Sequence, residues 1–214
     1  MVFGAAHATT DLMAFAVRHG TGYLRVAISP DVADRLGLPP MHNSFRQSGQ
    51  GGFTVSVDAR YGVGTGISAH DRACTARLIA DPNAQPDDFT RPGHLLPVVA
   101  GPQDGDGESA VARQALALVD AAGLTSAAAV YSELVSVRDP TMIMAADEAG
   151  AFARSVGIPA IWMPNTDPQH SRSRNGRNTM NDRHVGENPA PVFPRSPSGS
   201  QQPAHLAAVV PILS

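Results

Sequence analysis

Three short segments of this sequence carry candidate side chains for proton transfer. Asp71 ends the segment GVGTGISAHD, His94 ends RPGH, and Glu133 lies in YSEL. Carboxylates and imidazoles are common general acids and bases in enzymes. All 16 of the Lys and Arg residues are Arg, and the sequence has no Lys. Schiff-base catalysis on a ketone, which needs a lysine amine, is therefore excluded. The chemistry that remains uses carboxylates, imidazoles or a metal ion.

The segment from Phe53 to Thr75 is expected to position Asp71. Alternating apolar residues predict a strand from Phe53 to Val57, glycines predict a loop over residues 62–66, and a helix follows from about Ala69 to Ala80. A glycine-rich loop that enters a helix N-terminus directs free backbone N–H groups at an anion. The segment therefore predicts a site for a phosphorylated or acidic small molecule, with a plain tight turn as the alternative.

Each residue of this helix also has a structural interpretation. Ser68 and Asp71 have the spacing of a capping box, in which the carboxylate only bonds backbone N–H groups. Thr75 lies one turn later and would face the same way as Asp71, where it could bond substrate hydroxyls or phosphate. Taken alone, Thr75 would be a structural residue. Cys74, the one cysteine, excludes an internal disulfide framework and is expected to be a small core residue.

His94 and Glu133 are expected on strands. RPGH is interpreted as a turn that delivers His94 to the start of a strand, although a lone histidine is usually structural. Glu133 interrupts an otherwise apolar strand predicted from Ala127 to Val137. A carboxylate is costly to bury there without a purpose, which favours a functional role.

The order of several motifs resembles one enzyme family. FTVSVDAR is followed by TGIS, Asp71-Arg72, Thr75, Asp81-Pro82 and RPGH. Together these resemble 3,4-dihydroxy-2-butanone 4-phosphate synthase, a lyase of riboflavin biosynthesis that converts ribulose 5-phosphate to 3,4-dihydroxy-2-butanone 4-phosphate plus formate. The resemblance extends from Met1 to about Met163.

The resemblance implies roles for particular residues. His94, Glu133 and Asp71 would be the catalytic residues, and Thr75, Glu133 and Arg72 would bind the sugar phosphate. It also implies a Mg²⁺ or Mn²⁺ cofactor, a homodimer, and the fold of that family.

The sequence departs from the family at its metal site. The family's acidic DREDEGDL-like loop has no matching residues, and counting forward from His94 places Val111 where the family's RxGHTEA motif has its histidine. Arg25 stands where the family usually has a cysteine. No residue of this sequence is therefore assigned as a metal ligand. The alternative function is a catalytically impaired relative that acts as a binding or subunit protein.

Strand and helix patterns alternate along residues 1–163, which predicts a mixed α/β fold: one layered domain with a mixed sheet flanked by helices. A helix opened by Thr9 or Thr10 should end at Gly20, and the last helix is expected from Ile143 to Val156. Residues 164–214 are rich in Pro, Ser, Asn, Gly and Arg, and a disordered tail is expected there. Its apolar end, Leu206 to Leu213, could dock as an edge strand.

Composition limits the partners. The chain has 214 residues, 43% of them apolar, and a net charge of −3, so one core-forming domain is expected and neither nucleic acid nor an acidic membrane surface is implied. No stretch approaches the ~20 apolar residues of a membrane span. The start, MVFGAAHATT, lacks a charged region followed by an apolar run, which makes the cytoplasm the expected location.

Overall fold

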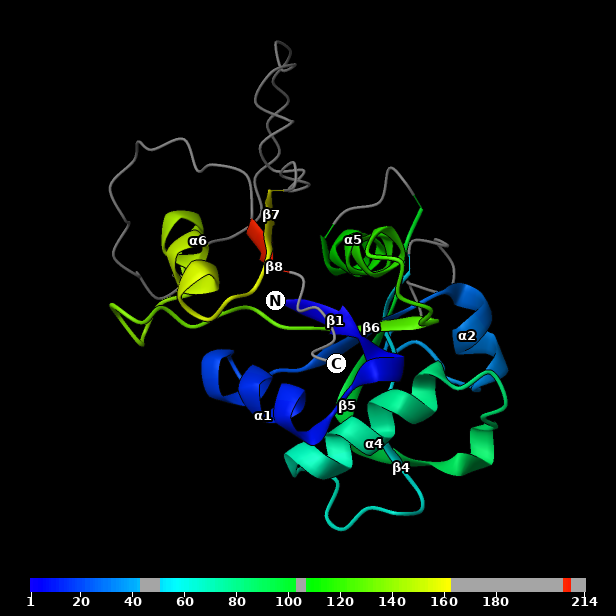
Figure 1. Cartoon of the computed structure of the whole chain (residues 1–214). Coiled ribbons are helices and arrows are strands. Elements are labelled where there is room, and N and C mark those ends of the chain that lie inside the picture. The colour runs from blue at the N-terminus through cyan, green and yellow to red at the C-terminus, as the bar shows by residue number, and fades with distance from the viewer. Residues whose placement is uncertain (43–50, 103–106, 163–205, 209–214) are drawn as a thin grey trace, which may run out of the picture.

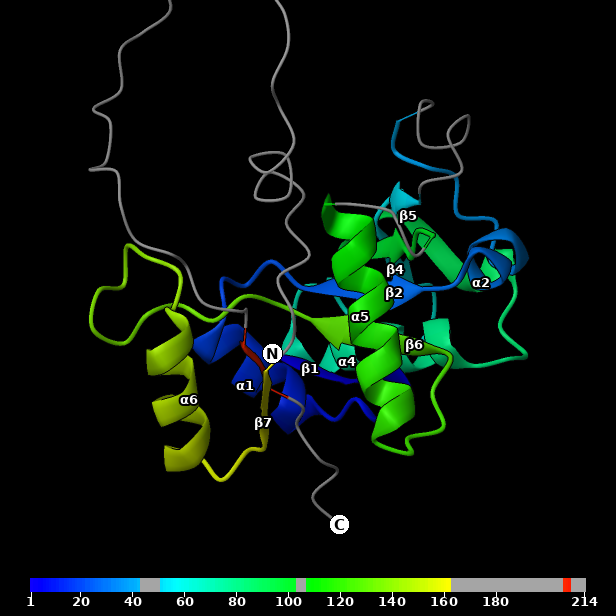
Figure 2. The same ribbon diagram turned by 90° about the horizontal axis from the view of Figure 1, so that it is seen from above.

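The computed structural model describes residues 1–42, 51–102, 107–162 and 206–208. A six-stranded mixed sheet has helices on both faces, as Figures 1 and 2 show. Helices α1 (Thr10–His19) and α4 (Ala69–Ala80) lie on one face, and α5 (Gly107–Ala121) lies on the other. This arrangement confirms the predicted mixed sheet flanked by helices.

The sheet has the strand order β1-β6-β2-β5-β3, and β4 also pairs with β5. Its members are β1 (Val2–Gly4), β2 (Arg25–Ile28), β3 (Gly52–Phe53), β4 (Val57–Ala59), β5 (Phe89–Val99) and β6 (Ala128–Tyr131). Strand β2 runs parallel to β5 and antiparallel to β6. In this register Arg25 stands between Leu96 of β5 and Tyr131 of β6.

Shorter elements complete the structure. They are the 3₁₀ helices η1 (Ala5–His7) and η2 (Pro86–Asp88), helices α2 (Pro30–Arg35) and α6 (Ala146–Ser155), and strands β7 (Ala160–Trp162) and β8 (Leu206–Ala208). Strands β7 and β8 pair antiparallel, apart from the main sheet. No helix among the described residues is long and apolar enough to cross a membrane.

Alternation along β2 divides the core into two layers. Val26 and Ile28 pack with the side chains of α1 and α4, whereas Ala27 packs with those of α5. Because successive side chains of a strand point to opposite faces, a strand buried on both sides is apolar along its whole length. Arg25 is the exception in β2, since it faces the α5 side and only 5% of its side chain is exposed.

Helix boundaries follow local signals. The Thr9 hydroxyl accepts a hydrogen bond from the Leu12 N–H and caps α1, which ends before Gly20 as predicted. The Ser68 hydroxyl accepts from the Asp71 N–H and opens α4 at the predicted residue. Helix α6, however, begins at Ala146 and not at Ile143.

Two predicted strands differ from the observed ones, and one observed strand was not predicted. The strand expected from Phe53 to Val57 is interrupted, because the Thr54 N–H bonds the Pro97 carbonyl while Pro97 has no N–H to continue the ladder. The strand expected from Ala127 to Val137 ends at Tyr131, so Glu133 lies beyond it. Strand β1 was not predicted.

Two further expectations concern RPGH and the C-terminal segment. RPGH is not a turn before a strand but lies inside β5, which already begins at Phe89 and contains a cis Arg91–Pro92 peptide bond. Leu206–Ala208 of the predicted edge strand pairs with β7 and not with the main sheet. The rest of the proposed tail lies outside the described residues.

Candidate functional site

His94 is held against a carboxylate that sequence reasoning did not single out. Its Nδ1 lies 2.7 Å from Oδ2 of Asp58, and its backbone N–H donates to Asp58 Oδ1 at 2.9 Å. Because a carboxylate accepts hydrogen bonds, we assign the ring proton to Nδ1, which leaves Nε2 as the proton acceptor. The His94 side chain is 40% exposed, so a ligand can reach it.

A bulge between β4 and β5 produces this pair. Val57 faces Leu95, but Asp58 faces Thr90, so the register shifts between these residues. Gly93 makes the close approach possible, since a Cβ there would overlap the backbone of Val57. The bulge turns His94 back over β4 and onto Asp58, and bulges commonly redirect side chains in this way.

The glycine-rich loop covers the pair and connects it to Asp71. Oδ2 of Asp71 accepts a hydrogen bond from the Gly66 N–H at 3.0 Å. Gly66 in turn packs on the other two residues: a Cβ at Gly66 would overlap the Asp58 carboxylate and lie 2.7 Å from Nδ1 of His94. The loop thus places Asp71, Asp58 and His94 around one glycine.

Hydrogen bonds set the charge of Asp71. Burial alone would raise the pKa of its carboxyl, but bonds from the N–H groups of Gly64 and Gly66 and from Ser68 hold the pKa below its usual value. Asp71 therefore stays ionised at neutral pH. In place of the predicted reciprocal capping box, its carboxylate orders the loop before the helix.

Thr75 and Arg72 have different surroundings. The Thr75 hydroxyl is buried, donates to the Asp71 carbonyl at 3.0 Å and accepts from the Ala59 N–H at 2.9 Å. These contacts favour the structural interpretation of Thr75. Arg72 is buried close to Asp58, and burial lowers its pKa against the raising effect of that carboxylate. Its Nη1 donates to the Gly22 carbonyl at 3.4 Å, and its Nε has no hydrogen-bond partner among the described residues.

Glu133 belongs to a second group, which we call the Arg25 cluster: Arg25, Glu108, Tyr131 and Glu133. The guanidinium of Arg25 contacts Glu133 through Nη2 and Oε1 of Glu108 through Nη1, the latter at 2.7 Å. The Tyr131 hydroxyl donates to the same oxygen of Glu108 at 2.7 Å. Burial would raise the pKa of Glu133, but the hydrogen bond and charge of Arg25 lower it below its usual value.

His94 and the Arg25 cluster lie at the same end of the sheet. The row Leu96, Arg25 and Tyr131 crosses three neighbouring strands. His94 precedes Leu96 in β5 and Glu133 follows Tyr131, and because β5 and β6 run in opposite directions both residues lie beyond the same end of that row. The loop before β2 lies between the two groups, since the Thr21 N–H donates to the Glu133 carbonyl and Gly22 accepts from Arg72.

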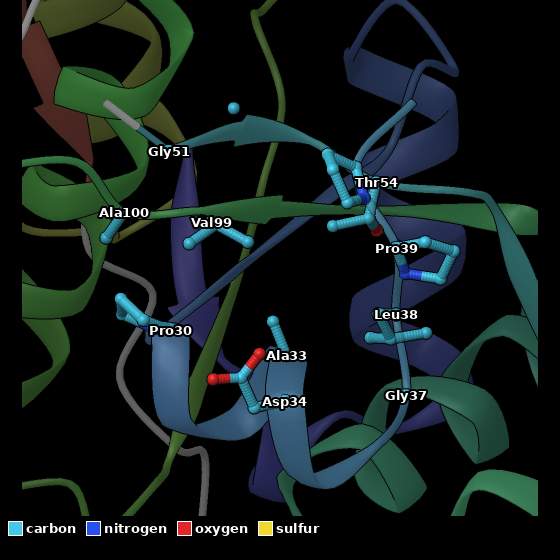
Figure 3. A pocket seen from close by; sticks show the side chains of 12 residues that line it. Pro30, Ala33, Asp34, Gly37, Leu38, Pro39, Gly51, Thr54, Val99 and Ala100 are labelled. Carbon is cyan, nitrogen blue, oxygen red and sulfur yellow. The ribbon is translucent and has the colours of Figure 1, made fainter. Parts of the chain in front are cut away.

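A pocket of 520 Å³ lies elsewhere, between α2 and the edge of the sheet (Figure 3). Its walls are mostly apolar and include Pro30, Ala33 and Val99, with Asp34 and the buried Thr54 among the polar residues. Val99 ends β5, and at ~3.3 Å per strand residue it stands about 16 Å along the strand from His94. The pocket is therefore separate from the His94 site.

The described residues form no preassembled cluster of metal-ligating side chains. Mg²⁺ is usually held by carboxylates and waters in octahedral geometry. No group of three or more His, Cys, Asp and Glu side chains that could hold a metal occurs in residues 1–42, 51–102, 107–162 and 206–208. Glu108 and Glu133 come close together, but the guanidinium of Arg25 occupies the space between them.

Sequence reasoning missed Asp58, Glu108 and the role of Arg25. Asp58 lies in FTVSVDAR and Arg25 in an apolar strand, so the burial cost that drew attention to Glu133 applied equally to both. Glu108 carried no such signal, because a carboxylate in a first helical turn is common. Val111, the residue at the position where the count from His94 places the histidine of the family's RxGHTEA motif, lies on α5 and is 39% exposed.

Comparison with known proteins decides the family. The family described as 3,4-dihydroxy-2-butanone 4-phosphate synthase matches residues 1–165, which is more than half of the chain. The chain belongs to this family. The match includes every residue of the Asp58–His94 pair and of the Arg25 cluster, so the family assignment and the two groups concern the same part of the molecule.

Relatives of the synthase family with closely similar sequences are longer proteins. Riboflavin biosynthesis protein RibBA of Mycolicibacterium gilvum is 43% identical over 158 residues, which cover 72% of this chain and 36% of that protein. RibBA of Mycobacterium tuberculosis strain H37Rv is 43% identical over 163 residues, or 75% of this chain and 38% of that protein. The chain thus spans little more than a third of the length of these relatives.

Solved structures of synthases have the same fold. The crystal structure of the Candida albicans synthase matches with a TM-score of 0.64 and 38% identity, over 73% of this chain and 76% of that one. A synthase structure in complex with two magnesium ions matches with a TM-score of 0.59 and 37% identity, over the same shares of the two chains.

Proposed function

We propose that this chain carries the lyase activity of its family, the conversion of ribulose 5-phosphate to 3,4-dihydroxy-2-butanone 4-phosphate plus formate. The family match over residues 1–165 supports the reaction, and the contact between His94 and Asp58 is the observation that carries its chemistry. The reaction balances without another reactant, because the five-carbon sugar phosphate is divided into a four-carbon phosphate and formic acid.

His94 is the proposed proton-transfer group. The reaction requires a proton to leave a carbon next to the ketone, and Asp58 holds His94 with Nε2 available to accept it. The same bond stabilises the imidazolium that forms, so His94 can return the proton at a later step. The exposed fraction of the His94 side chain, 40%, allows contact with a small ligand.

Glu133 and Asp71 are proposed to assist from two sides. Glu133 is half-exposed at the same end of the sheet and can accept a second proton. Asp71 remains ionised and holds the loop over the site, where it can also accept hydrogen bonds from substrate hydroxyls. Arg72 is proposed to bind the sugar phosphate because the family resemblance implies it and because its guanidinium lies near Asp58 at the same site. Thr75 positions α4 on β4.

A requirement for Mg²⁺ or Mn²⁺ is part of the proposal, since one structure of a synthase contains two magnesium ions. A divalent ion would supply positive charge to stabilise an enediolate. The described residues form no group of three or more metal-ligating side chains, so the roles proposed above belong to protein side chains alone. A homodimer and a cytoplasmic location are likewise proposed from the family and from the sequence.

The test is formate release from ribulose 5-phosphate, followed with a coupled formate dehydrogenase in the presence of Mg²⁺. Purified full chain should release formate, and His94→Ala should lower kcat by ~10² to 10⁴-fold, the usual range for acid–base groups. His70→Gln is the matched control, because His70 is an exposed histidine that contacts Thr10 and Cys74 and lies outside the site. Absence of turnover by the folded wild-type protein would contradict the proposal.

A further inference from the structure

Arg25 is the most enclosed charged group of the site. It lies on the inner strand β2, between β5 and β6, and 5% of its side chain is exposed. Its guanidinium carbon stands 4.7 Å from the ring centre of Tyr131 and 5.3 Å from that of Tyr23. Cations within about 6 Å of an aromatic ring are attracted to its face. The two rings and the strand fix the guanidinium in one place.

The two terminal nitrogens of this fixed group lie against carboxylates from different elements, whereas its Nε has no hydrogen-bond partner among the described residues. Nη1 bonds Glu108 in the first turn of α5, and Nη2 contacts Glu133 after β6. Tyr131 adds a hydroxyl bond to Glu108, so that carboxylate is held from two directions. Glu133 is held by Arg25, and the rest of its side chain is open, with 40% exposed.

We propose that Arg25 is a positioning residue: its guanidinium is the cation shared by Glu108 and Glu133, and it fixes the Glu133 carboxylate, in charged form, at the His94 end of the sheet. This inference rests on the proposed function only for the role of Glu133 in turnover. The contacts of Arg25 with both Glu108 and Glu133, which we call the Arg25 bridge, are a property of the structure and can be tested without substrate.

Several groups face Glu133 and influence its charge. Arg25 from β2 favours the ionised form through a hydrogen bond and its charge, and burial opposes it. The amino group of Met1, which donates to the Ser132 carbonyl, also favours the ionised form. Glu108 from α5 and Tyr131 complete the surroundings. Arg25 makes the direct contact, so its removal should dominate any change.

The bridge requires an arginine. A planar guanidinium can bond two carboxylates at once and lie against aromatic rings, whereas a lysine ammonium is a single point charge on a flexible stem. Arg25→Lys should therefore preserve the charge near Glu133 but lose the connection to Glu108. The Arg25→Lys variant therefore distinguishes the positioning role of Arg25 from the effect of its positive charge.

The experiment is a ¹³C NMR titration of glutamate side-chain carboxyls, with Glu133 assigned by its loss in Glu133→Gln. We expect Arg25→Gln to raise the pKa of Glu133 by about 1 to 3 units, because an opposite charge at this distance typically lowers a carboxyl pKa by that amount. Arg138→Gln is the control, since it removes one arginine from an exposed ion pair with Asp147. An unchanged pKa of Glu133 in Arg25→Gln would overturn the proposal.

Arg25→Gln leaves two carboxylates without their counter-ion and can prevent folding. The charge-compensated Arg25→Gln/Glu108→Gln variant answers the same question, with a raised pKa of Glu133 again expected.

Kinetics provide a second measurement. If the wild type turns over ribulose 5-phosphate, the acid limb of its kcat profile should shift to higher pH in Arg25→Gln. In Arg25→Lys the limb should keep its position, while kcat falls at least tenfold with little change in KM. A full-speed Arg25→Lys enzyme would contradict positioning. A wild-type protein without turnover would contradict the proposed function, and the NMR titration alone would then test whether Arg25 positions Glu133.

Discussion

At the scale of single residues, the partner of His94 decides what that histidine can do. A histidine without a fixed neighbour can rotate and exchange tautomers, whereas the two bonds to Asp58 define the orientation of its ring and the acceptor nitrogen. If His94 is the proton-transfer group, as proposed, Asp58 orients it, and the contribution of Asp58 should appear in turnover more than in substrate affinity.

We therefore expect Asp58→Asn to lower kcat by ~10² to 10⁴-fold, the range that acid–base groups supply, with little change in KM. An asparagine amide keeps the shape of the side chain but can present N–H₂ to Nδ1 and reverse the tautomer of His94. Formate release gives both constants, and thermal melting confirms that the variant is folded. A kcat within twofold of the wild type would show that Asp58 does not orient a catalytic imidazole.

At the scale of elements, the glycine loop before α4 has to pass very close to the site. Gly66 has a φ of +85° and touches both Asp58 and His94, whereas Gly62 has a φ of +74° with open space around it. Gly64 needs neither a positive φ nor close contact, since its nearest neighbour would be Asp71 at 3.6 Å. Alanine substitutions at these three glycines therefore distinguish the effect of backbone strain at a positive φ from the effect of steric overlap with Asp58 and His94.

Gly66→Ala should lower kcat by at least tenfold, because the added methyl group pushes the loop off His94 and Asp58. Gly62→Ala carries the strain of a positive φ alone and should lose about 1 kcal/mol of stability with near-normal turnover. Gly64→Ala should be close to neutral. Kinetics and urea unfolding of the three variants test this, and equal kcat losses in Gly62→Ala and Gly66→Ala would contradict the packing explanation.

Another element is held in place by a buried carboxylate. Glu148, in the first turn of α6, accepts hydrogen bonds from the Ser136 hydroxyl at 2.8 Å and the Val137 N–H at 2.7 Å. Burial would raise its pKa, but these bonds and one from the Arg138 N–H lower it below its ordinary 4.5. Glu148 thereby attaches α6 to the turn that follows Glu133.

Because the folded-state pKa of Glu148 is depressed, its stabilising effect is complete above pH 4.5 and is lost as the pH falls through the folded-state pKa. Glu148→Gln should therefore be less stable than the wild type at pH 7, and the difference should narrow below pH 4.5. Urea unfolding of both proteins across this range measures the difference. A gap that stays constant down to acid pH would contradict the assigned role of the charge.

At the scale of the whole molecule, local signals predicted elements better than their pairing. The caps at Thr9 and Ser68 fixed two helix starts, because a hydroxyl at the N-cap acts within one turn. Nothing local indicated that β1 pairs with β6, or that β2 lies between β5 and β6. The Arg25 cluster combines three elements that are far apart in sequence, so its parts became apparent only once the sheet order was known.

The sheet order also makes a prediction about the C-terminal part of the chain. Within the part of the chain that the structure describes, the six strands of the main sheet come from residues 2–131, and β8 pairs only with β7. The composition of residues 164–205 predicts that protease sites there are cut first. Limited proteolysis followed by mass spectrometry should give a stable fragment that ends near Pro164. Equal resistance of the two parts would contradict this division.

The central claim is that the chain removes one carbon of ribulose 5-phosphate as formate by acid–base chemistry at His94. The most direct measurement uses ribulose 5-phosphate labelled with ¹³C at C4, the carbon that the family resemblance implies is lost as formate, and follows the products by NMR with the full chain and Mg²⁺. We predict that the label appears in formate and not in the four-carbon phosphate, and that His94→Ala abolishes this within the same time. Label that remains in the unreacted sugar phosphate, or formate released at an equal rate by His94→Ala, would contradict the account.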